Sequence, residues 1–233
     1  MTVAAGEPVG PRDTAAFEVR DALREPGCVV CRLSLRSVSR ILRTISYEQV
    51  NDIALRKELR RARGFCNLHA HQWLRESRSV LGTALIYRDV SQAALADLSA
   101  PGGEQRGGLL KALRGATGRR HQATCPACRE QLEAEARYVE VLLAVVAAEP
   151  EVLADSSAVC RRHAVAALRV GAPGADVVAE RTRRAVEELV GELDEVIRKE
   201  DYRFRHEART EAERTAPARA IAWAAGAEGL TED

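Results

Sequence analysis

The chain has 233 residues, of which 46% are apolar, 30% are charged and 4% are aromatic, and its net charge is +1. The apolar content can fill a core, which argues against a chain that is disordered throughout. The small net charge argues against a strongly electrostatic nucleic-acid binder. Few aromatic residues among many Ala, Leu and Val favour helices over a β-sandwich, so we expect an all-α protein.

The apolar stretches predict the compartment. Residues 1–14 lack the apolar segment of a secretory signal, and the most apolar run, residues 139–148, is too short to span a bilayer. We therefore expect a cytoplasmic protein without membrane association. Thiols stay reduced in that compartment, where a CxxC pair indicates a metal or redox site before a disulfide.

Helical periodicity and turn residues divide the chain into segments. We expect a disordered lead-in over residues 1–13, a first helical repeat over 14–99, a Gly-rich linker over 100–124, a second helical repeat over 125–206 and a C-terminal tail over 207–233. In each repeat a CxxC opens a long helix, a short helix follows, and a CxxH opens the next helix. The helix after the first CxxH is expected to continue to about residue 98, with Leu74, Leu81 and Leu85 in the core.

All six cysteines belong to this duplicated pattern. The ligand candidates are Cys28, Cys31, Cys66 and His69 in the first copy, and Cys125, Cys128, Cys160 and His163 in the second. Two donors separated by two residues can face one ion, because a tight turn or a first helical turn brings them together. Three thiolates and one imidazole are the number and kind of ligands that Zn²⁺ takes in closed sites. The pattern predicts an internally duplicated helical bundle with two Cys3His metal sites at helix N-termini.

The identity and pairing of these sites remain open at this stage. Two zinc ions are favoured by the ligand count, while an iron–sulfur cluster with three Cys and one His is the main alternative. Buried cysteines beside ordinary helix-end histidines, or a dithiol redox pair, are weaker interpretations. We expect each site to form within one copy, although a crossed pairing of Cys28 and Cys31 with Cys160 and His163 would use the same residues.

Several segments resemble a known family. They are residues 64–69 (GFCNLH), 82–87 (GTALIY), 125–128 (CPAC) and, most specifically, 201–207 (DYRFRHE) with 216–221 before Trp223. Together they resemble an uncharacterised prokaryotic domain-of-unknown-function family whose members carry CPxC and GFCxxH motifs twice. The chain departs from that family at His206, where an acidic residue is typical, and at Ala208, where a Pro is common. The resemblance covers about residues 15–223, and implies one architecture without implying an activity.

The segment after the second repeat allows two interpretations. It can lock onto the metal domain through ion pairs, or Arg203 and Arg205 can bind an anionic ligand or a partner carboxylate. No Ser-His-Asp arrangement or phosphate-binding loop is visible, so the sequence indicates no catalytic residues. It does not indicate an oligomeric state either. We predict a metal-binding scaffold or interaction module with two structural zinc sites and a protein partner. The alternative is an iron–sulfur protein in electron transfer, redox or sulfur chemistry.

Overall fold

The structure, a computed structural model, describes residues 11–99, 125–153 and 159–231. These residues form helices and contain no β-strand, which confirms the all-α prediction. The α-helices are α1 (Pro11–Ala22), α2 (Val29–Thr44), α3 (Ile53–Ala62), α4 (Asn67–Glu76), α5 (Val80–Ser99), α8 (Pro126–Ala148), α9 (Arg161–Val170), α10 (Ala175–Glu200) and α11 (Glu211–Ala225). Within these ranges no helix has both the length and the apolar character needed to cross a bilayer.

Some sequence predictions fall outside the described ranges. The predicted lead-in overlaps residues 1–10 and the predicted linker occupies residues 100–124, neither of which the structure describes. Helix α1 begins at Pro11, three residues before Thr14, where a helix was expected. Proline is favoured in the first helical turn, since the N–H that it lacks has no partner within a helix there.

The described chain divides into two compact units. The first unit comprises residues 1–34 and 134–230, and the second comprises residues 35–133 and 231–233. Helices α2 and α8 each contribute residues to both units. Each unit therefore combines parts of both predicted repeats.

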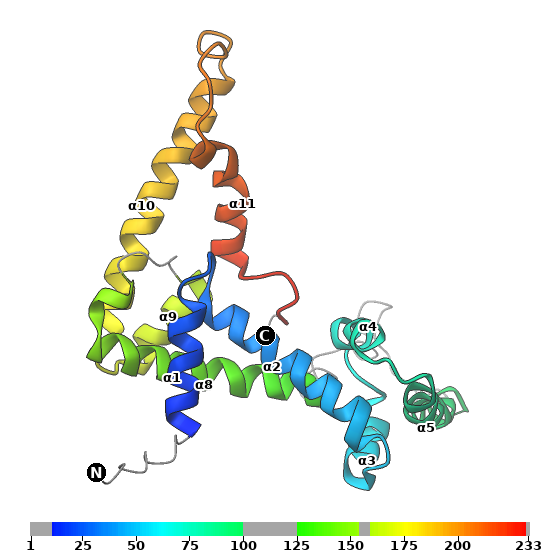
Figure 1. The fold of residues 1–233 in the computed structure, drawn as a ribbon. Helices are drawn as coiled ribbons and strands as arrows, with labels where there is room; N and C mark the ends of the chain where they lie inside the picture. Colours follow the sequence, from blue (N-terminus) through cyan, green and yellow to red (C-terminus); the bar gives the residue numbers. More distant parts are fainter. Residues whose placement is uncertain (1–10, 100–124, 154–158, 232–233) are drawn as a thin grey trace, which may run out of the picture. The chain divides into compact units, whose positions relative to one another are not determined.

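The apolar core of the first unit is built on helix α8, whose course is drawn in Figure 1. Tyr138 and Leu142 of α8 are buried together with Val19 of α1 and Val30 at the start of α2. Polar contacts fix α1 against the same helix, because Tyr138 donates a hydrogen bond to Glu18 and Arg20 pairs with Glu149. Helix α9 and the start of α10 complete this core.

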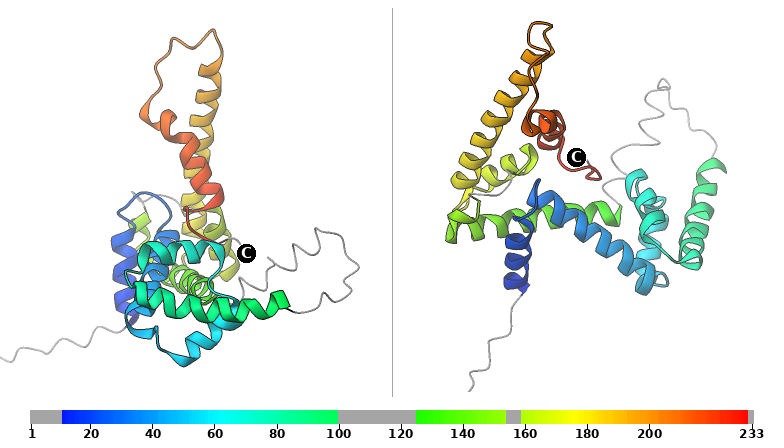
Figure 2. Two further views of the ribbon diagram at one scale, coloured as in Figure 1. Left: turned by 90° about the vertical axis from the view of Figure 1, so that its right-hand side faces the viewer. Right: turned by 45° about the horizontal axis from the view of Figure 1, so that its top comes forward.

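Helices α10 and α11 of the first unit lie side by side as a long hairpin in all views (Figures 1 and 2). Lys199 of α10 donates to both carboxylate oxygens of Glu213 of α11, at 2.8 and 2.7 Å, and both side chains are buried. Glu213 also completes a capping box with Thr210 at the start of α11. The predicted tail therefore contains a well-capped helix, which the T-x-x-E pattern at 210–213 could have indicated.

The second unit has its own core. Val38 and Leu42 of α2 are buried with Leu59 of α3, and Phe65 stacks on Trp73 with ring centroids 5.4 Å apart. Asp52 caps α3 by accepting a hydrogen bond from the amide of Leu55.

The prediction of one long helix after the first CxxH is wrong. Helix α4 ends at Glu76, and α5 begins at Val80 after a short extended segment. Leu74 and Leu81, which were expected in the core, are 64% and 70% exposed, while Leu85 is half-buried. Ser79 accepts a hydrogen bond from the amide of Gly82 and so caps the start of a new helix. The continuous periodicity of apolar residues had suggested a single helix through this point.

Candidate metal centres

Each CxxH motif opens a helix in the same way. Cys66 is the N-cap of α4 and Cys160 is the N-cap of α9, both with extended backbone, at φ/ψ of −62°/168° and −66°/163°. The histidine stands three residues later, in the first helical turn. N-cap and N3 side chains lie next to each other, the adjacency that capping boxes use. The cysteine Sγ and histidine Nδ1 accordingly approach to 3.3 Å in Cys66–His69 and 3.2 Å in Cys160–His163.

Each CxxC motif also opens a helix. Cys28 directly precedes α2 and Cys125 directly precedes α8, and the carbonyl oxygen of each accepts the first helical hydrogen bond. The second cysteine of each pair then lies in the first turn of its helix. The two CxxC motifs therefore present their thiols in the same local register.

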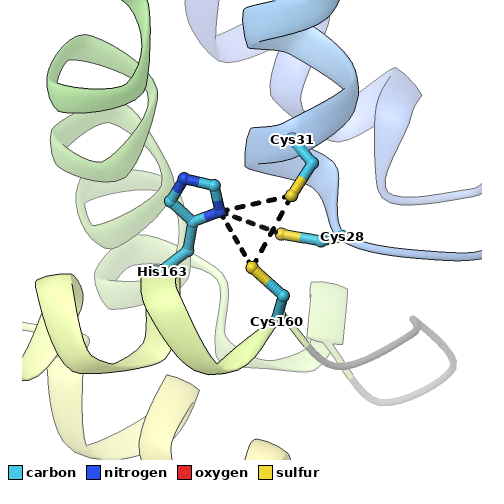
Figure 3. A group of neighbouring side chains, drawn as sticks. All are labelled: Cys28, Cys31, Cys160 and His163. Carbon is cyan, nitrogen blue, oxygen red and sulfur yellow. Dashed lines mark hydrogen bonds between the residues drawn. The ribbon is translucent and has the colours of Figure 1, made fainter. Parts of the chain in front are cut away.

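The first group of donors, here called the Cys28 cluster, consists of Cys28, Cys31, Cys160 and His163 (Figure 3). Nδ1 of His163 lies 3.4 Å from Sγ of both Cys28 and Cys31, and the sulfurs of Cys31 and Cys160 are 3.6 Å apart. Figure 3 shows the four donor atoms converging from the start of α2 and the start of α9.

The second group, here called the Cys66 cluster, consists of Cys66, His69, Cys125 and Cys128. Nδ1 of His69 lies 3.7 Å from Sγ of Cys125 and 3.4 Å from Sγ of Cys128, and the sulfurs of Cys66 and Cys128 are 3.5 Å apart. All four residues are buried. In each cluster all donor atoms lie within 4.8 Å of one another, so each could hold a metal ion.

The pairing of the motifs is crossed. Each cluster takes its CxxC from one copy and its CxxH from the other, which corrects the expectation that a site forms within one copy. Each cluster nevertheless lies within one compact unit, the Cys28 cluster in the first and the Cys66 cluster in the second. None of the six cysteines forms a disulfide.

Hydrogen bonding shifts the pKa values of two donors of the Cys28 cluster in opposite directions. Hydrogen bonds with Cys28 and Cys31 hold the pKa of the Cys160 thiol far below its usual range. Burial acts to lower the pKa of His163, but hydrogen bonds with Cys160 and Cys28 and the nearby Glu135 carboxylate raise it to about 11. Metal ligands must be deprotonated, so an ion that binds His163 through Nδ1 would displace any proton held there.

In the Cys66 cluster, too, one thiol has a lowered pKa and the histidine has a raised pKa. Hydrogen bonds with Cys128 and Cys66 lower the pKa of the Cys125 thiol. Burial acts to lower the pKa of His69, but contacts with Cys125 and Cys66 raise it to about 9.

Glu135 of α8 lies beside the Cys28 cluster and was not among the residues that the sequence analysis singled out. Its side chain is 8% exposed, and its Oε2 lies 3.4 Å from Nε2 of His163, on the side of the ring opposite the sulfurs. The same oxygen lies 2.8 Å from the guanidinium of Arg162. A histidine that binds metal through one nitrogen typically presents the other to a carboxylate or carbonyl.

A backbone segment lies against the Cys28 cluster. Gly226, which ends α11, has φ +88°, and a Cβ at this position would lie 3.7 Å from Sγ of Cys31 and 4.0 Å from Sγ of Cys160. Arg161 also donates to the carbonyl of Ala224 at 3.5 Å. The end of α11 therefore forms part of the wall around two of the thiols.

The predicted anion-binding arginines lie at the turn of the α10–α11 hairpin, outside both clusters. Arg203 forms a bidentate pair with Asp201 and lies over the ring of Phe204. Arg205 is exposed and donates through Nε to the carbonyl of Glu200. Ion pairs of Glu207 with Arg198 and of Arg209 with Glu200 connect the same turn to α10.

The fold and site define a helical protein with two Cys3His groups at helix N-termini. Neither a protein-family model nor a solved structure matches the chain. It is 37% identical over 67 residues to the "Uncharacterized 23.9 kDa protein in xynA 3'region" of Caldicellulosiruptor sp. (strain Rt8B.4). The match covers 29% of this chain and 32% of that protein, so the chain spans about a third of the relative's length. The name of this relative states no activity.

Proposed function

We propose that the protein is a cytoplasmic helical scaffold with two structural zinc ions, one in the Cys28 cluster and one in the Cys66 cluster, and that it acts by binding a protein partner. The convergence of four Cys and His donors in each cluster carries this proposal. The donors of each cluster come from two segments distant in the sequence, so one ion would tie those segments together. Structural zinc contributes folding free energy directly, on the order of 10 kcal/mol in small zinc modules.

The donor spacing supports a single tetrahedral ion. Two sulfurs bonded to Zn²⁺ at about 2.3 Å stand about 3.8 Å apart, and a sulfur and an imidazole nitrogen stand about 3.5 Å apart. The sulfur–sulfur distances in the structure are 3.6 and 3.5 Å, and the sulfur–nitrogen distances run from 3.2 to 3.7 Å. Small movements of these side chains would bring the donor–donor distances to those around a Zn²⁺ ion.

The same spacing favours zinc over an iron–sulfur cluster. In a cubane cluster each protein ligand binds a different iron, so the donors surround a group much larger than one ion. Four protein donors also complete the coordination of zinc, whereas catalytic zinc keeps an open position for water or substrate. This favours a structural over a catalytic role.

The α10–α11 hairpin is our candidate for the partner-binding surface. Tyr202 at its turn is 81% exposed, beside the exposed Arg205. Tyrosine and arginine are the residue types enriched in binding hot spots. We propose that Arg203 and Arg205 contact a carboxylate or another anionic group of the partner. Arg203 would first have to exchange its contact with Asp201, so we expect Arg205 to contribute more.

Metal analysis of protein purified without oxygen tests the zinc proposal. We expect about two zinc ions per chain, no visible absorption, and loss of helical circular dichroism when a strong chelator removes the ions. Iron with labile sulfide and a broad visible band would overturn zinc in favour of the iron–sulfur alternative. Iron without sulfide would support one ion per cluster but overturn the choice of zinc.

A further inference from the structure

The two clusters match in local geometry but differ in what surrounds the histidine. Helices α4 and α9 each have ten residues and begin with the same CxxH register, and α2 and α8 begin with the same CxxC register. Position by position, the two metal groups can therefore be compared directly. The comparison turns on the ring nitrogen that does not face the sulfurs, Nε2 of His69 and Nε2 of His163.

In the Cys28 cluster this nitrogen faces a carboxylate. Nε2 of His163 lies 3.4 Å from Oε2 of Glu135, somewhat longer than a well-formed hydrogen bond but within ion-pair range. Arg162, the residue before His163, holds the same carboxylate oxygen at 2.8 Å. The carboxylate is thus anchored by a cation as it faces the imidazole.

In the Cys66 cluster, Nε2 of the fully buried His69 has neither a hydrogen-bond nor an ion-pair partner among the residues that the structure describes. Nε2 of His163 also makes no hydrogen bond of good geometry, so the difference between the two sites is the Glu135 carboxylate in ion-pair range. Glu135 follows Cys128 by seven residues on α8, and the residue seven after Cys31 on α2 is Val38. Val38 is fully buried in the apolar cluster that contains Cys66, Cys125 and Cys128. The register therefore puts an apolar residue where the other copy has a carboxylate.

This difference has consequences for metal affinity. A carboxylate at Nε2–H keeps that proton in place, directs the lone pair of Nδ1 to the ion and strengthens the nitrogen as a donor. Loss of such an outer partner typically weakens metal binding by about 10–100-fold. A buried N–H without a partner also costs free energy whenever His69 binds an ion through Nδ1.

We propose that Glu135 is a positioning residue that makes the Cys28 cluster the tighter metal site, and that the Cys66 cluster, with Val38 at the corresponding position, gives up its ion first. This inference rests on the proposed function, since it requires that both clusters bind a metal ion. It assigns the two sites different roles. The first holds its ion permanently, and the second exchanges its ion as the supply of free metal changes.

The test must be made at equilibrium. Cys28 is partly exposed, whereas the other cysteine ligands are buried, so release rates would also depend on access to that thiol. Zinc-loaded full-length protein is therefore equilibrated with a series of chelators of increasing affinity. Bound zinc is then counted, and the cysteines that react with an alkylating reagent are identified by mass spectrometry.

For the wild-type protein we expect two separate steps. Cys66, Cys125 and Cys128 should become reactive at about 10–100-fold weaker competition than Cys28, Cys31 and Cys160. Simultaneous release, or the reverse order, would overturn the inference. This result does not depend on whether any variant folds.

The variant E135Q then tests the residue itself. It should weaken the Cys28 cluster by about 10–100-fold and leave the Cys66 cluster unchanged, because only one histidine loses its carboxylate. The matched control is E140Q, which removes an exposed carboxylate from the same helix and should move neither step. The Cys66 cluster serves as an internal reference, since a general loss of stability would shift both steps. An unchanged Cys28 step in E135Q would refute the role of Glu135. Protein that binds no metal at all would instead refute the proposed function.

Discussion

Removing one cysteine tests the crossed pairing directly. In the variant C160A, the Cys28 cluster loses one of its four donors, and Cys28 and Cys31 lose a partner that comes from α9. We expect these two thiols to become reactive, while Cys125 and Cys128 of the Cys66 cluster stay protected. Zinc content should fall from about two ions toward one per chain.

The size of the effect follows from the donor set. Binding of structural zinc contributes about 10–16 kcal/mol, so an equal share for each of four donors is roughly 3 kcal/mol. At 1.4 kcal/mol per tenfold, the affinity of the Cys28 cluster should fall by on the order of a hundredfold or more. A chelator concentration that leaves the wild-type cluster filled should therefore empty the variant.

Site-resolved alkylation and mass spectrometry provide the assay, and C66A provides the reciprocal variant. C66A should expose Cys125 and Cys128 and leave Cys28 and Cys31 protected. The control H71A removes an exposed histidine from the same helix as His69 and should change neither cluster. If C160A instead exposed Cys125 and Cys128 while Cys28 stayed protected, the sites would form within each copy and the crossed arrangement would be wrong.

Three further changes test the packing around the sites. K199M leaves the carboxylate of Glu213 buried without its cation, so we expect the packing of α11 on α10 to lose about 3–5 kcal/mol of stability. Hydrogen exchange of the α11 amides should become faster, and unchanged exchange would contradict this expectation. Burial acts to raise the pKa of Asp89, but two neighbouring arginines lower it overall. Its stabilising contribution is therefore present above about pH 4 and is lost as the pH falls through the folded-state pKa. D89N should lower the free energy of unfolding by about 2–3 kcal/mol at pH 7, as measured by denaturant melts, and should make this free energy less sensitive to acid. In G174A the new Cβ would lie 2.5 Å from a backbone oxygen of α8 at φ +91°, so we expect a loss of about 1–3 kcal/mol, whereas G191A, which meets nothing within 4 Å, should gain about 0.5–1 kcal/mol.

The sequence was sufficient for the fold class and for the set of residues that form the two clusters. Cysteines and histidines at fixed spacing are rare enough to identify themselves, and the spacing also indicates that they lie at helix starts. The pairing could not be read in the same way. Cys31 is 35 residues from Cys66 and 129 residues from Cys160, and the entropic cost of closing the longer loop exceeds that of the shorter by only about 1 kcal/mol. This difference is too small to favour one pairing.

Some of the remaining features depend on tertiary contacts, whereas others left a local signal that the sequence analysis did not use. Glu135 is one of several glutamates along α8, and only its distance to Nε2 of His163 distinguishes it. The periodicity of apolar residues predicted one helix with Leu74 and Leu81 in the core, but the chain breaks between α4 and α5. Ser79 was a local sign of the new helix start. The capping box at Thr210 and Glu213 was readable from the sequence and predicts α11 when it is recognised.

Crossed pairing makes the two copies dependent on each other. In the proposed function, the CxxC of the first copy completes the Cys28 cluster, and the CxxH of the same copy completes the Cys66 cluster. Losing either copy therefore removes half of the donors from both sites, and no complete site remains in the other copy. Two sites within separate copies would have allowed each copy to persist as a zinc module of its own. The exchange of motifs instead makes each set of four donors depend on both copies, over residues 28–163 for the Cys28 cluster and 66–128 for the Cys66 cluster. The difference between Glu135 and Val38 can then tune one site without removing the fold that both sites share.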